Sequence, residues 1–79
     1  MLGKKEKKIV ITFYTTADAM ATEMECKASG IKGRLFPVPR QLSAGCGLAW
    51  KSEPELREEI KKLLDEKAIE YEGIYECMV

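Results

Sequence analysis

The feature that most constrains the fold is a run of β-branched and aromatic residues near the N-terminus, Lys8-Ile9-Val10-Ile11-Thr12-Phe13-Tyr14. Such side chains favour extended backbone because they pack well on a pleated surface. Successive side chains of a strand point to opposite faces, so this run carries apolar side chains on both of its faces. That pattern is typical of a strand in the centre of a sheet, and it predicts neighbouring strands on both sides.

A first helix is predicted to follow this strand. Thr15 or Thr16 can cap it, and Ser29-Gly30 can end it. Apolar side chains recur between these signals at helical spacing, and they predict a core-facing stripe made of Ala17, Met20, Ala21, Met24 and Ala28. Cys26 falls on the opposite side of this stripe, so we expect its thiol to be exposed, either without a role or as a resolving thiol.

A second helix is predicted after Ser52-Glu53-Pro54-Glu55, which has the pattern of a capping box with proline in the first turn. Its apolar stripe is narrow, as in a helix that covers one face of a sheet, and consists of Leu56, Ile60, Leu63 and Leu64.

Three further segments have the pattern of strands, namely residues 34–39, 46–51 and 71–78. Pro37 cannot donate a ladder hydrogen bond, so the segment 34–39 belongs at a sheet edge. The resulting order, β-α-β-β-α-β, predicts an α+β fold of the ferredoxin-like type: a four-stranded antiparallel sheet with two helices on one face. Strands two and four are the edges of such a sheet. We expect residues 1–79 to form a single domain, with residues 1–7 as a solvated basic tail.

Charge and cysteine usage limit the classes of function. Lysine plus arginine and aspartate plus glutamate both number 13, so the net charge of zero argues against general nucleic-acid binding. No apolar run approaches the ~20 residues of a membrane span, and three cysteines without a CxxC pattern indicate free thiols. We therefore expect a cytoplasmic protein. A chain this short buries a modest core, so stabilisation by a homodimer is left open.

Cys46 is the candidate functional residue, because it lies between two glycines in Ser43-Ala44-Gly45-Cys46-Gly47. Gly45 and Gly47 leave room for an incoming sulfur and can turn amide groups toward an anion. Arg40 and Lys51 flank the thiol in sequence, and we expect Arg34 to face it across a hairpin, which would favour the thiolate. The alternative is a tight turn around a small buried cysteine. Cys77 is expected to be a packing residue.

The sequence contains no histidine, no phosphate loop and no dinucleotide fingerprint. These absences remove the Cys-His nucleophile pair, histidine-based acid–base catalysis and most metal sites. Thiol chemistry at Cys46 is the remaining choice.

The stretch from Gly33 to Trp50, with its Pro37-Val38-Pro39-Arg40 and Cys46-Gly47 elements, closely resembles the signature of the selenium/sulfur carrier-like protein family. The similarity extends back through Ala17-Asp18-Ala19-Met20-Ala21 and Gly30-Ile31 and covers almost the whole chain. These proteins were formerly grouped as a domain of unknown function.

The resemblance implies a carrier rather than a turnover enzyme, without cofactor or resident metal. Cys46 would hold a persulfide or selenopersulfide, received from a donor such as a cysteine desulfurase and passed to an acceptor protein. Gly45, Gly47, Arg40, Lys51, Arg34, Ser43 and Pro39 are then the candidate binding and activating residues.

Two other classes of function stay open at this point. One is a protein–protein interaction or assembly module anchored by Trp50, Phe36 and Tyr14, if these aromatic side chains lie exposed together. The other is a thiolate metal carrier, against which stands the lack of a second cysteine near Cys46.

Overall fold

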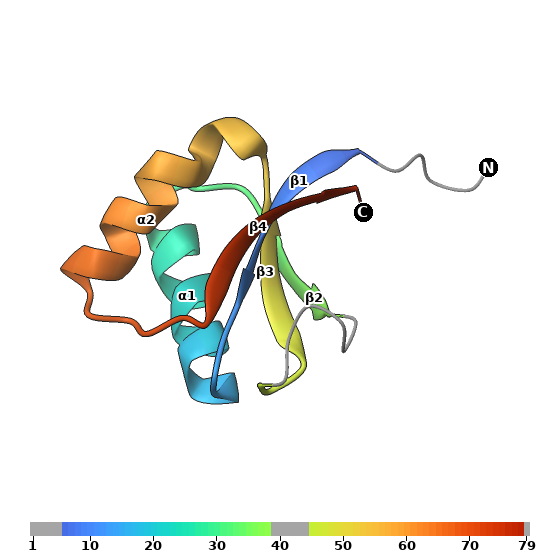
Figure 1. The fold of residues 1–79 in the computed structure, drawn as a ribbon. Coiled ribbons are helices and arrows are strands. Elements are labelled where there is room, and N and C mark those ends of the chain that lie inside the picture. Colours follow the sequence, from blue (N-terminus) through green and yellow to red (C-terminus); the bar gives the residue numbers. More distant parts are fainter. Residues whose placement is uncertain (1–5, 39–44, 79) are drawn as a thin grey trace.

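The computed structural model describes residues 6–38 and 45–78 of the chain (Figure 1). Predictions from the sequence that concern residues 1–5, 39–44 or 79 lie outside this part. The elements follow in the order β1 (Lys7–Thr12), α1 (Thr16–Ala28), β2 (Arg34–Pro37), β3 (Leu48–Ser52), the 3₁₀ turn η1 (Pro54–Leu56), α2 (Arg57–Glu66) and β4 (Gly73–Met78). All predicted strands and helices are therefore present, with ends shifted by a few residues.

The described strands form one antiparallel sheet in the order β2-β3-β1-β4, and both helices lie on the same side of it (Figure 1). This is the predicted α+β ferredoxin-like sandwich. The β1 strand is central, and β2 and β4 are the edges, as expected. Pro37 is the last residue of the edge strand β2, where its missing N–H costs the sheet little.

The main core fills the space between the sheet and the helices. Ile9 and Ile11 of β1, Trp50 of β3 and Leu64 of α2 are completely buried there. A smaller cluster on the other face of the sheet consists of Val10, Val38 and Ala49, with Phe36 and Cys77 packed against it. The apolar character of β1 on both faces thus reflects two separate clusters.

The predicted orientation of α1 is wrong. Its buried residues are Ala19, Thr22 and Cys26, whereas Met20 is 56% exposed and Met24 is 69% exposed. Small side chains let the helix approach the sheet closely, and Thr22 satisfies its hydroxyl by donating to the Asp18 carbonyl oxygen at 2.9 Å. Because methionine is hydrophobic, the sequence predicted that the methionine side of α1 faces the core, whereas that side faces solvent.

The ends of α1 agree with the prediction. Thr15 is the N-cap, and its hydroxyl oxygen accepts a hydrogen bond from the Asp18 amide at 3.2 Å. Beyond the other end of the helix, Gly30 has a φ of +74°, a left-handed conformation that glycine adopts without steric cost.

The predicted capping box of the second helix is also wrong. Ser52 is the last residue of β3, and its hydroxyl donates to the Lys32 carbonyl oxygen instead of capping a helix. Glu53 is followed by the 3₁₀ turn, with Pro54 as its first residue, and α2 begins only at Arg57. The Ser52 hydroxyl is therefore used in a hydrogen bond to the backbone of a neighbouring segment and is not available as a helix cap.

Candidate functional site

The Gly45-Cys46-Gly47 turn lies directly before β3, at the same end of the sheet as the start of α1 (Figure 1). Two backbone hydrogen bonds fasten it to neighbouring strands. The Cys46 amide donates to the Phe13 carbonyl oxygen at 3.3 Å, and the Val38 amide donates to the Gly47 carbonyl oxygen at 3.0 Å. The turn is thus held against the end of β1 on one side and the end of β2 on the other.

The two glycines are needed for different reasons. Gly47 has a φ of +85°, and a Cβ added there would meet nothing within 4 Å, so backbone conformation alone favours glycine. A Cβ on Gly45 would lie 2.3 Å from the Phe13 carbonyl oxygen and 3.3 Å from the Tyr14 Cα. Gly45 therefore permits a close approach of two backbone segments.

The Cys46 side chain is half-buried and packs against the edge of the main core. Its Sγ donates to the Leu48 carbonyl oxygen over 3.6 Å, a contact that requires the protonated thiol. Tyr14, 59% exposed, follows the residue that anchors the Cys46 amide. The sequence carries no signal for the hydrogen bond between the Cys46 amide and Phe13, because the two residues are far apart in the chain.

The other two cysteines have different surroundings. Cys26 is 0% exposed, which corrects the expectation of an exposed thiol. Burial, reinforced by the carboxylates of Glu25 and Glu59, raises the pKa of Cys26 to about 11. Cys77 lies on the edge strand β4 and packs against the smaller cluster. At neutral pH the Cys26 thiol is protonated and inaccessible, so it is not a candidate for a resolving thiol.

The structure does not bring Arg34 and Lys51 to the thiol. Arg34 lies opposite Lys51 in the register of β2 and β3, whereas Pro37 lies opposite Leu48 beside the turn. The Lys51 ammonium stands over the Phe36 ring, 5.1 Å from its centroid, on the sheet face away from the helices. The two cations are therefore at the opposite end of the hairpin from Cys46. The register of the hairpin determines the distance of Arg34 and Lys51 from the thiol, and closeness in sequence does not predict it.

Three predicted site residues, Pro39, Arg40 and Ser43, lie outside the described residues. The proposed aromatic anchors of an interaction module do not form one exposed patch, because Trp50 is 0% exposed in the core. Among residues 6–38 and 45–78, no group of three or more histidine, cysteine, aspartate or glutamate side chains is placed to hold a metal ion. Within the same residues, no helix is long and apolar enough to cross a membrane.

Comparison with known proteins gives one family and one curated relative. Residues 8–76 match the model of a family described as "Putative Se/S carrier protein-like". The chain is 28% identical over 76 residues to the uncharacterised protein YtiA of Escherichia coli strain K12, an alignment that covers 91% of this chain and 89% of the relative. No solved structure matches.

Proposed function

Because this chain belongs to the Se/S carrier protein-like family, we propose that it carries a sulfur or selenium atom on the Sγ of Cys46 and passes that atom from a donor to an acceptor protein. The observation that carries the proposal is the setting of Cys46. Its thiol is partly accessible in a turn whose glycines place no side chain beside it, whereas Cys26 is fully buried.

The transfer is an exchange between a thiol and a persulfide. The Cys46 thiol loses its proton, and the thiolate attacks the terminal sulfur of a donor persulfide. A new S–S bond forms at Cys46 while the S–S bond of the donor breaks, and the donor cysteine leaves as a thiolate that takes up a proton. Attack by an acceptor thiolate on the terminal sulfur reverses these roles and regenerates Cys46. The chain gains and loses one sulfur atom without net oxidation.

Local structure supports this chemistry in two ways. The thiol donates to the Leu48 carbonyl oxygen at 3.6 Å, and because S–H is a weak donor this hydrogen bond can be given up at small cost. The turn also lies at the end of the molecule where α1 begins, and the N-terminus of a helix carries partial positive charge (Figure 1). The carboxylate of Asp18 in the first turn of α1 offsets part of this positive charge.

The proposal implies a carrier rather than a turnover enzyme. In each step a cysteine thiolate is the nucleophile, that of Cys46 in loading and that of the acceptor in release, so neither a histidine base nor a second cysteine of this chain is required. Donors of this chemistry are persulfide-forming enzymes such as a cysteine desulfurase, and free thiols point to the reducing cytoplasm as the compartment.

Intact-mass measurement tests the proposal. The protein is incubated with a cysteine desulfurase and cysteine, or with a selenium donor, beside the variants Cys46→Ala and Cys77→Ala. We expect the mass of one chalcogen atom on the wild type and on Cys77→Ala, but not on Cys46→Ala. Equal loading of Cys46→Ala, or no adduct with any donor, would remove Cys46 as the carrying thiol.

A further inference from the structure

A pocket of about 370 Å³ lies at the opposite end of the β2–β3 hairpin from Cys46. Its lining residues come from the start of β1, the segment before β2 and the end of β3, and they are Lys8, Lys32, Gly33, Arg34, Lys51, Ser52 and Glu53. The pocket, named here the basic pocket, is therefore lined by four cations and one carboxylate. Its volume is within the range of sites for small molecules.

The single carboxylate of the basic pocket is already neutralised. Glu53 accepts a hydrogen bond from the Lys8 ammonium, which Glu6 also contacts at 3.1 Å. These hydrogen bonds, first that of Glu53 and then that of Glu6, raise the pKa of Lys8, so the ammonium keeps its charge. Lys8, Glu53 and Glu6 together bring one net negative charge to this edge of the pocket, which leaves three cations against it.

The other three cations have no carboxylate partner within the described part of the chain. Lys32 and Arg34 are exposed, and the Lys51 ammonium stands over the ring of Phe36. Elsewhere on the surface lysines do pair with carboxylates, as Lys27 does with Glu23. Three unpaired cations around one pocket create a local positive potential in a chain whose net charge is zero.

Close packing holds the backbone segments from which these cationic side chains extend. The Ser52 hydroxyl donates to the Lys32 carbonyl oxygen and joins the segment before β2 to the end of β3. A Cβ on Gly33 would lie 2.6 Å from both the Lys51 carbonyl oxygen and the Trp50 ring, so the two segments are in direct contact. Arg34 then pairs with Lys51 across the two strands. The backbone that forms the wall of the pocket is therefore held in place without a ligand.

We propose that the basic pocket binds a small soluble anion through a phosphate group. The terminal oxygens of a phosphate accept hydrogen bonds from several directions, which suits a pocket lined by two lysines and one arginine that have no carboxylate partner in the described residues. A nucleic acid fits less well, because Glu6 and Glu53 border the cations and no basic stripe continues from them in the described residues.

Titration with inorganic pyrophosphate at low ionic strength tests the proposal. Binding is followed by calorimetry and by the fluorescence of Trp50, the only tryptophan, whose ring lies against Gly33 in the pocket wall. We expect saturable binding of one equivalent, weakened about tenfold by Arg34→Gln and by Lys51→Gln, since each removes one charge-assisted hydrogen bond. Added sodium chloride should weaken it further.

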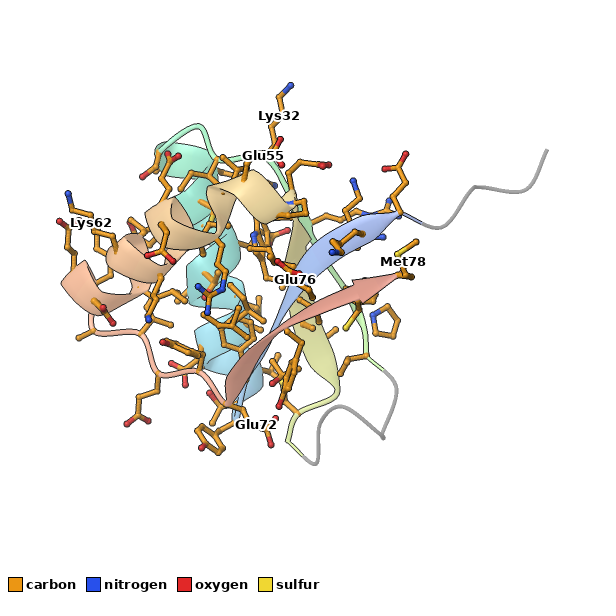
Figure 2. All side chains as sticks on the ribbon, turned by 45° about the horizontal axis from the view of Figure 1, so that its top comes forward. Lys32, Glu55, Lys62, Glu72, Glu76 and Met78 are labelled. Carbon is orange, nitrogen blue, oxygen red and sulfur yellow. The ribbon has the colours of Figure 1, made fainter. Side chains whose placement is uncertain are left out.

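The matched control is Lys62→Gln on α2, which removes the same charge from a lysine that stands well apart from Lys32 (Figure 2). It should bind pyrophosphate as the wild type does. Equal weakening by Lys62→Gln, or no saturable binding, would overturn the proposal. Tighter binding of a short single-stranded oligonucleotide than of pyrophosphate would also overturn it. Chalcogen loading of Cys46 is measured separately, so the two proposals can fail independently.

Discussion

Alanine substitutions at Gly45, Gly47 and Gly30 test whether the backbone of the Cys46 turn matters for function beyond its effect on stability. Gly47 and Gly30 have φ values of +85° and +74°, and an added Cβ meets nothing within 4 Å at either position. The cost of Gly47→Ala and of Gly30→Ala is therefore conformational, about 1–2 kcal/mol each. A domain with a total stability of roughly 5–10 kcal/mol stays folded after either change.

Gly45→Ala should be more severe. Its Cβ would lie 2.3 Å from the Phe13 carbonyl oxygen, so the turn must move away from β1 and lose the hydrogen bond from the Cys46 amide. We expect a loss of about 3 kcal/mol, the upper end of the usual range for overpacking. Urea denaturation, followed by the fluorescence of Trp50, gives the midpoint and slope for each variant.

The loading assay then distinguishes the site from the fold. Gly30→Ala matches Gly47→Ala in conformation and cost but lies beyond the end of α1, away from the thiol. We expect slower chalcogen loading in Gly45→Ala and Gly47→Ala and an unchanged rate in Gly30→Ala. Alanine tolerated as well at position 45 as at position 47, or one loading rate for all three variants, would contradict these roles of the glycines.

Three further predictions concern α1 and its buried thiol. Because the pKa of Cys26 rises from 9.0 to about 11 on folding, its contribution to stability is complete below pH 9.0. It should then fall by at most about 1.4 kcal/mol per pH unit toward pH 11; a Cys26→Ala variant with the same pH profile in urea denaturation would contradict this. Alkylation of the native protein, followed by peptide mapping, should label Cys46 well before Cys26, and labelling of both at one rate would show that Cys26 is not buried. Met24→Gln should change the free energy of unfolding by less than about 0.5 kcal/mol, whereas Ala19→Gln should cost about 2 kcal/mol or more; equal costs in urea denaturation would restore the methionine face as the buried one.

The order of the elements was predictable because the two-residue period of strands, the period of about 3.6 residues in helices and a few turn residues indicate it. Alternation in β1, helical spacing in α2 and Pro37 at an edge are local patterns that tertiary structure left in place. The face of α1 was not predictable in this way. Its contact with the sheet selects small side chains, so Ala19 and Cys26 are buried while longer apolar side chains point outward.

The candidate site shows the same division. Flanking glycines made Cys46 the candidate residue, and the structure adds that its amide is hydrogen-bonded to the Phe13 carbonyl oxygen. Arg40 and Lys51 were expected beside the thiol because they flank it in sequence, and Arg34 because a hairpin was expected to bring it opposite. Antiparallel pairing sends Arg34 and Lys51 to the far end of the hairpin, where they line the basic pocket. Register is set by the whole sheet, so the sequence of the loop alone does not contain it.

A pulse–chase relay tests most directly whether Cys46 is a carrier. The protein is loaded with radiolabelled sulfur from a donor persulfide, freed of donor and mixed with an unlabelled thiol acceptor. The account predicts that label leaves Cys46 and appears on the acceptor in equal amount as a persulfide. Label that stays on the protein, or that is released as free sulfide while the acceptor gains none, would contradict it.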